Sequence, residues 1–255
     1  MLQPEDSWGS HAVSHVYEMR GDTRAGIDWL EDSRSVWSRC NNFSFHMAWH
    51  LALLHMERGD HSRVLDLYDR EIRPQPTDDF RDVANAVSLL WRLEHLGIHV
   101  GGRWSDLAEI VRRRRTDTTL VFASLHNLIA LVALGDRSAA AELVMAMQVK
   151  AQGNDDQARV AAEVGLPLAR AITGMGSEQG ALDRIALQTP RVGGSNAQRD
   201  LFILALAESA SRRGDTQAFG RICQARRRLK AEDNLITTVD SRASSPNAPL
   251  RAYRY

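Results

Sequence analysis

A glycine recurs along the chain at an almost constant interval, and this repeat constrains the fold more than any other feature. The glycines are Gly21, Gly59, Gly97, Gly135, Gly176 and Gly214. Successive members lie 38 residues apart, except for one interval of 41, and four of them precede an aspartate. Each follows an apolar run of helical periodicity, which a glycine can end because it adopts the left-handed conformation without a Cβ clash. The period predicts a stacked array of about six antiparallel helical hairpins.

The second hairpin shows the pattern most clearly. Residues 44–58 carry apolar side chains at helical spacing, and Gly59 and Asp60 then turn the chain. Residues 63–72 form the second helix, which ends before Pro74. The expected fold is therefore all-α, with a superhelical arrangement of hairpins like that of tetratricopeptide repeats.

Two hairpins are irregular. In the third, a short segment separates the turn glycine from the helix that resumes at Trp104. In the fifth, Pro167 starts or kinks a helix because proline has no backbone N–H to donate. We expect the array to cover residues 9–230, and residues 231–255 to form a polar, poorly ordered tail.

Charge and cysteine content exclude several function classes. The 32 basic and 32 acidic residues cancel, so no global field attracts a nucleic acid or an anionic membrane. Two cysteines are too few for a disulfide framework, which favours a reducing compartment. There is no apolar run of roughly 20 residues to span a membrane, and the N-terminus does not resemble a signal peptide. We expect a soluble, cytoplasmic protein without nucleic-acid or membrane partners.

Histidines are concentrated on the first helices of the hairpins. His11, His15 and Glu18 follow i, i+4, i+7 spacing and share one helix face, and His46 and His50 repeat the i, i+4 spacing. The further candidates on such helices are Trp49 and His126. Counted back from the turn glycines, His11 lies ten residues away and His50 and His126 lie nine away, which predicts nearly equivalent positions on successive helices.

These histidines leave two interpretations open. Paired imidazoles at i, i+4 can bind one metal ion, so His11, His15, His46 and His50 are candidate ligands of a divalent transition metal. The glutamate of the HExxH motif is absent, because Ala12 follows His11 and Met47 follows His46. The other interpretation, which needs no cofactor, is that the histidines are groove-facing polar residues that hydrogen-bond neighbouring helices or an acidic ligand.

A second polar cluster begins at Gly193, where a glycine-rich loop precedes a helix. Its candidate ligand-binding residues are Asn196, Gln198, Arg199 and Asp200. Backbone N–H groups at a helix start can hold an anion. The alternative is a capped loop, with Ser195 or Asn196 as the N-cap and with Arg199 and Asp200 in structural ion pairs.

Several motifs, in the same order along the chain, resemble the tetratricopeptide-repeat protein 38 family. They are HAVSHVYEM at 11–19, HMAWHLAL at 46–53, VLDLYD at 64–69, LLWRL at 89–93, RW at 103–104, GLP at 165–167 and GGSNAQRD at 193–200. The resemblance spans about residues 9 to 230 and implies an α-helical repeat fold of poorly defined function. The family pattern has another helical half before His11. We therefore expect the N-terminal hairpin to bind a second copy or a partner subunit, because terminal repeats need a polar outer face.

The leading function is binding of a peptide, a protein or a small acidic ligand in a concave groove lined by His, Trp and Glu. The lining of such a groove by first helices is what the tetratricopeptide resemblance implies. The alternative is an enzyme that uses the clustered histidines with Glu18, either on a metal ion or as acid–base groups that titrate near neutrality.

Overall fold

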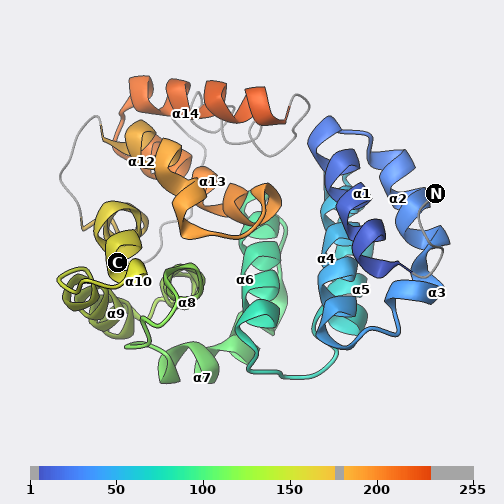
Figure 1. Ribbon diagram of the computed structural model, residues 1–255, viewed down its shortest axis with the longest axis horizontal. Coiled ribbons are helices and arrows are strands. Elements are labelled where there is room, and N and C mark those ends of the chain that lie inside the picture. Colours follow the sequence, from blue (N-terminus) through green and yellow to red (C-terminus); the bar gives the residue numbers. More distant parts are fainter. Residues whose placement is uncertain (1–5, 176–180, 231–255) are drawn as a thin grey trace. The chain divides into compact units, whose positions relative to one another are not determined.

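The computed structural model describes residues 6–175 and 181–230, and in these ranges the chain forms helices, turns and loops but no strand (Figure 1). The predicted all-α fold is confirmed for this part of the chain. The chain divides into two compact units. Residues 1–100 make most of the first, and residues 101–226 make most of the second.

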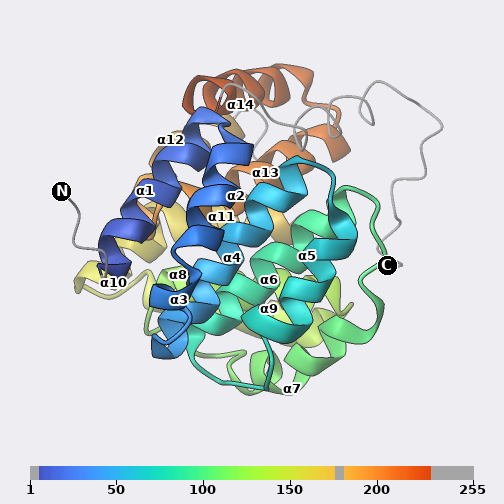
Figure 2. The ribbon, with the colours of Figure 1, turned by 90° about the vertical axis from the view of Figure 1, so that its right-hand side faces the viewer.

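The first unit consists of helical hairpins that pack in succession. Its helices are α1 (Ser7–Arg20), α2 (Thr23–Asp32), α3 (Arg34–Trp37), α4 (Asn41–Glu57), α5 (His61–Leu67) with a π-helical turn at Tyr68–Ile72, and α6 (Phe80–His95). Helix α2 packs on α1 and on α4, and α4 also packs on α5 and α6 (Figure 2). Trp37, Trp49, Leu51 and Leu54 are fully buried between these helices.

The second unit is also helical throughout its described residues. It contains a 3-10 turn at Gly101–Trp104, α7 (Ser105–Arg113), α8 (Val121–Ala133), α9 (Arg137–Lys150), α10 (Asp156–Val160), a π-helical turn at Ala161–Gly165, α11 (Leu166–Thr173), α12 (Leu182–Gln188), a 3-10 turn at Thr189–Val192, α13 (Asn196–Arg212) and α14 (Thr216–Leu229). Helix α8 packs on α7, α9 and α11, and α13 packs on α11 and α12. The predicted irregularity before Trp104 is the first of these 3-10 turns.

The turn glycines take the conformation that the repeat predicts. Gly21, Gly59, Gly97, Gly135 and Gly214 all have φ between 68° and 83°. Gly176 lies outside the described residues. The glycine that ends α11 is Gly174, with φ 73°.

The aspartates that follow the glycines have a role that the repeat alone does not reveal. The side chain of Asp136 accepts a hydrogen bond from the backbone N–H of Ala139 at the start of α9. Asp215 does the same for Ala218 at the start of α14, at 2.9 Å. Such caps satisfy amide groups that have no partner within the helix. At these two hairpins the glycine ends one helix and the aspartate starts the next.

Pro167 lies in the first turn of α11, as predicted for a proline that starts or kinks a helix. The π-helical turn at Ala161–Gly165 precedes it, so α10 and α11 join without a break. At Gly165 an added Cβ would lie 2.6 Å from Cγ1 of Val121, so the start of α11 approaches α8 too closely for any larger residue.

Two predictions concern the chain ends and membranes. The predicted polar tail at 231–255 lies outside the described residues. Within the described residues, no helix has both the length and the apolar character needed to cross a membrane.

Candidate metal centre

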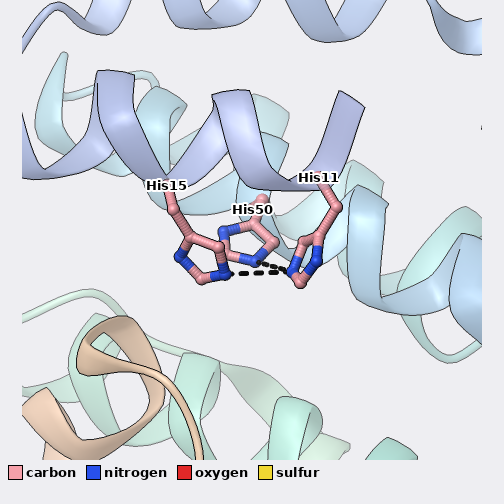
Figure 3. A group of neighbouring side chains, drawn as sticks. All are labelled: His11, His15 and His50. Carbon is pink, nitrogen blue, oxygen red and sulfur yellow. Dashed lines mark hydrogen bonds between the residues drawn. The ribbon is translucent and has the colours of Figure 1, made fainter. Parts of the chain in front are cut away.

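Four histidines of the first unit bring their Nε2 atoms together. His11 and His15 come from α1, and His46 and His50 come from α4. His11 Nε2 lies 3.0 Å from that of His15 and 3.1 Å from those of both His46 and His50. The Nε2 atoms of His46 and His50 are 3.2 Å apart. Figure 3 shows three of these imidazoles, with His11 and His15 projecting from one helix toward His50 on the next. The predicted pairs therefore form one cluster.

The two helices run side by side in the same direction. Trp8 contacts Phe43, His11 contacts His46, and His15 contacts His50, so the order along α1 matches the order along α4. The buried residues of α1 are small or polar, namely Ser10, Ser14 and Glu18. Ser10 also accepts, through its carbonyl, a 3.1 Å hydrogen bond from Trp29 Nε1 of α2. Because the buried face of α1 carries two serines instead of large apolar side chains, the imidazoles have room between α1 and α4.

The outer nitrogens of the two α4 histidines meet polar partners. His50 Nδ1 lies 3.2 Å from a carboxylate oxygen of Glu18, and both side chains are buried. His46 Nδ1 lies 3.2 Å from Asn85 Oδ1, on α6. A carboxylate or amide oxygen accepts hydrogen bonds, so each Nδ1 carries the proton in a neutral imidazole. The Nε2 atoms of His46 and His50 then point unprotonated lone pairs into the cluster.

A positive charge between these lone pairs would relieve their mutual repulsion. Two unprotonated nitrogens repel at 3.2 Å, and the one proton available on His11 Nε2 cannot make a linear hydrogen bond to both. Zinc binds imidazole nitrogen at about 2.0–2.1 Å, which places neighbouring ligand atoms roughly 2.9 Å apart at right angles and roughly 3.3 Å apart in a tetrahedron. The observed separations of 3.0–3.2 Å lie between these values.

Burial keeps the imidazoles neutral. It lowers the pKa of His11 to about 4 and that of His46 to about 3, with neighbouring histidines adding to both effects. Burial also lowers the pKa of His15, and that of His50 well below its ordinary value. A metal ion binds the neutral imidazole. At neutral pH, protons would therefore compete little with a metal ion for these nitrogens.

Aromatic side chains surround the cluster. Trp49 is fully buried and stacks on the His46 imidazole at 5.3 Å and 16°. On the other side, Trp8 and Phe43 contact each other at 4.4 Å and both meet the His11 ring nearly edge-on. Five of the predicted residues on the first two hairpins thus share one site with Glu18.

His126 has a different environment. It lies in the second unit, is 1% exposed, and its ring contacts Phe122 and Phe202. Its Nδ1 lies 2.8 Å from the carbonyl of Phe122 one turn earlier. This histidine is therefore part of an aromatic core.

The cluster near Gly193 is a capped loop, as in the alternative interpretation, and Asp200 is in an ion pair, whereas Arg199 contacts carbonyl and amide oxygens. Ser195 is the N-cap of α13 in a capping box with Gln198. Arg199 donates to the carbonyl of Gly194 and, at 2.6 Å, to Oδ1 of Asn196. Asp200 forms a bidentate ion pair with the buried Arg226 of α14. These side chains stabilise the loop and anchor α14.

Three residues of the histidine site were not predicted. Asn85 lies in the irregular third hairpin. The sequence feature that could have indicated it is a polar amide side chain in the middle of the mostly apolar run 83–90. Trp8 and Phe43 lie one turn before a histidine on their helices, at i−3 from His11 and His46. That spacing places them on the histidine face and could have been noticed.

No protein-family model matches the chain, and no solved structure matches it. The resemblance to the tetratricopeptide-repeat protein 38 family therefore stays a prediction. The site has to be interpreted from its own geometry and chemistry.

Proposed function

We propose that this protein binds a divalent transition-metal ion through His11, His15, His46 and His50. The observation that carries the proposal is the convergence of the Nε2 atoms of His11, His46 and His50 at 3.1–3.2 Å. Two of these atoms are held in the unprotonated form by partners on Nδ1. Metal-ligating histidines generally donate their other ring N–H to a carboxylate or carbonyl oxygen in this way.

The donor set narrows the choice of ion. Four imidazoles without a thiolate suit zinc, copper, nickel, cobalt or iron. Magnesium and calcium prefer oxygen ligands. Glu18 places one negative charge beside His50 and offsets part of the charge of the ion.

Acid–base catalysis without a metal has less support. A general base works best with a pKa near the working pH, whereas burial lowers the pKa of His11 to about 4 and that of His46 to about 3. Groove binding also has less support from these side chains, because Glu18, Trp49, His50 and His126 are interior residues.

Metal content and affinity test the proposal directly. The full chain is purified without a tag, stripped with a chelator and titrated with Co²⁺ or Zn²⁺. We expect one equivalent to bind, and the His15→Ala/His50→Ala double variant to lose it. The matched control is His61→Ala/His99→Ala, which removes two histidines of the same unit outside the cluster. Binding that is equal in both double variants, or absent from the wild type, would contradict the proposal.

We propose further that the hairpins belong to a tetratricopeptide-repeat-like superhelix. The left-handed glycines Gly21, Gly59, Gly97 and Gly135, at constant spacing, support this arrangement. An experimental structure in which one rotation and translation relates successive hairpins would be the expected result. Unrelated orientations of successive hairpins would argue against it.

We also propose that the protein is cytoplasmic and that it forms a dimer. Cys40 is a half-buried free thiol, as is usual in a reducing compartment. Val16 is 52% exposed on α1 and could lie in a contact with a second copy. Light scattering is expected to show a dimer that Val16→Asp converts to monomers, and a wild-type monomer at all concentrations would contradict this.

A further inference from the structure

We infer that the metal ion in this site takes one exchangeable ligand, an organic anion whose apolar group lies against Trp8 and Phe43. This inference rests on the proposed metal site and adds the chemical class of its ligand. It follows from the charge of the site, the direction from which it is accessible, and the side chains beside that access.

The charge of the site favours an anion. Imidazole binds a metal ion in its neutral form and so brings no negative charge. Glu18 is in contact with the cluster through His50. A divalent ion bound by these imidazoles would therefore keep one positive charge that the Glu18 carboxylate does not balance, in a partly buried site. A monoanion bound to the ion would neutralise it, and charges are costly to leave unpaired away from water.

The cluster is accessible from the side of α1. His50 on α4 is 1% exposed, whereas His11 and His15 on α1 are only half-buried. Trp8 lies one turn before His11 on α1, and Phe43 one turn before His46 on α4. A ligand that reaches the ion past His11 would therefore pass these two rings.

The two rings form an aromatic surface next to the ligand position. Trp8 is 69% exposed although it contacts both Phe43, at 4.4 Å, and His11, at 5.8 Å. Aromatic rings bind other rings through offset or edge-to-face contacts. An anion that carries a ring can use the metal and this surface together, whereas acetate can use only the metal.

The Nε2 separations are compatible with a further ligand on the ion. Neighbouring ligands at right angles, as in a five-coordinate site, would lie roughly 2.9 Å apart at zinc–imidazole distances. The observed separations of 3.0–3.2 Å lie between that value and the tetrahedral one. A strictly tetrahedral site would instead be closed by its four imidazoles.

Anion titrations of the Co²⁺-loaded full chain test this inference, because bound Co²⁺ has a visible spectrum that responds to its ligands. Acetate and benzoate serve as probes that share a carboxylate and differ in the ring. We expect both to change the spectrum, and benzoate to bind about tenfold more tightly, the equivalent of about 1.4 kcal/mol. Trp8→Ala should abolish the preference for benzoate over acetate.

The control is Val16→Ala, another exposed apolar residue of α1, which should keep the preference. Failure to bind Co²⁺ would overturn the metal site itself. Stoichiometric Co²⁺ whose spectrum ignores both anions would show a closed four-imidazole site and overturn only the inference. Equal affinities for acetate and benzoate, or a preference that survives Trp8→Ala, would overturn the role of the aromatic surface.

Discussion

At the scale of single residues, Glu18 decides how the site is organised. Its carboxylate fixes the proton of His50 on Nδ1 and is 6% exposed. We predict that Glu18→Gln weakens metal binding by roughly tenfold or more, as is typical when the partner of a metal-ligating histidine is changed. Competition titration with a chelating dye measures this. Asp28→Asn, an exposed change on α2, is the control, and an equal affinity in both variants would contradict the prediction.

The histidine pKa values make the metal-free protein sensitive to acid. The unfolded chain has histidines with pKa values near 6.5, whereas in the fold those of His11 and His46 are about 4 and about 3. Between these values the unfolded chain binds more protons, so stability is fully present above about pH 6.5 and falls as the pH drops toward 4.

We predict that the free energy of unfolding declines over this window by up to about 1.4 kcal/mol per pH unit for each such histidine. Urea unfolding in the presence of a chelator measures it. His46→Gln should reduce the slope, and His61→Gln should not. A flat profile between pH 6.5 and 4.5 would show that these imidazoles are not buried in the neutral form.

The histidine pairs of the cluster could be predicted at this scale, because helical spacing fixes which side chains share a face. His11 with His15, and His46 with His50, needed only the i, i+4 relation. The partner Asn85 could not be predicted in the same way. It comes from α6, and the contact between α6 and α4 depends on packing that no local pattern contains.

At the scale of elements, glycine acts in two different ways. In the hairpin turns it supplies a left-handed conformation, which a 38-residue period reveals. At Gly165 it permits a close approach to Val121, which no period reveals, because the contact joins α8 to a turn more than 40 residues later. Gly174 ends α11, two residues before Gly176, the glycine that the sequence repeat singled out.

We predict that Gly165→Ala destabilises the second unit by about 1–3 kcal/mol, the usual cost of overpacking. The reason is the 2.6 Å approach of the new Cβ to Val121. Gly220→Ala is the matched control. A Cβ at Gly220 of α14 meets nothing within 4 Å, so alanine should instead stabilise by up to about 1 kcal/mol. Urea unfolding of the two variants measures the difference, and equal effects would contradict this account of Gly165.

At the scale of the whole molecule, the proposed metal site belongs to one of two compact units. An ion present at about 100 times its dissociation constant stabilises the state that binds it by about 2.7 kcal/mol. We predict that this gain is confined to the first unit. Hydrogen exchange should slow in α1 and α4 when Zn²⁺ is added and stay unchanged in α8 and α13. Equal slowing in both units would contradict this prediction.

The two ligand pairs also have a consequence for the ancestry of the site. His46 follows His11 by 35 residues, and His50 follows His15 by the same number, on helices that run in the same direction. Each helix therefore contributes the same half of the site. This offset is three residues shorter than the 38-residue interval between Gly21 and Gly59, so the two pairs do not occupy equivalent positions of the repeat. Duplication of one hairpin that carried a histidine pair would therefore not by itself have created the site.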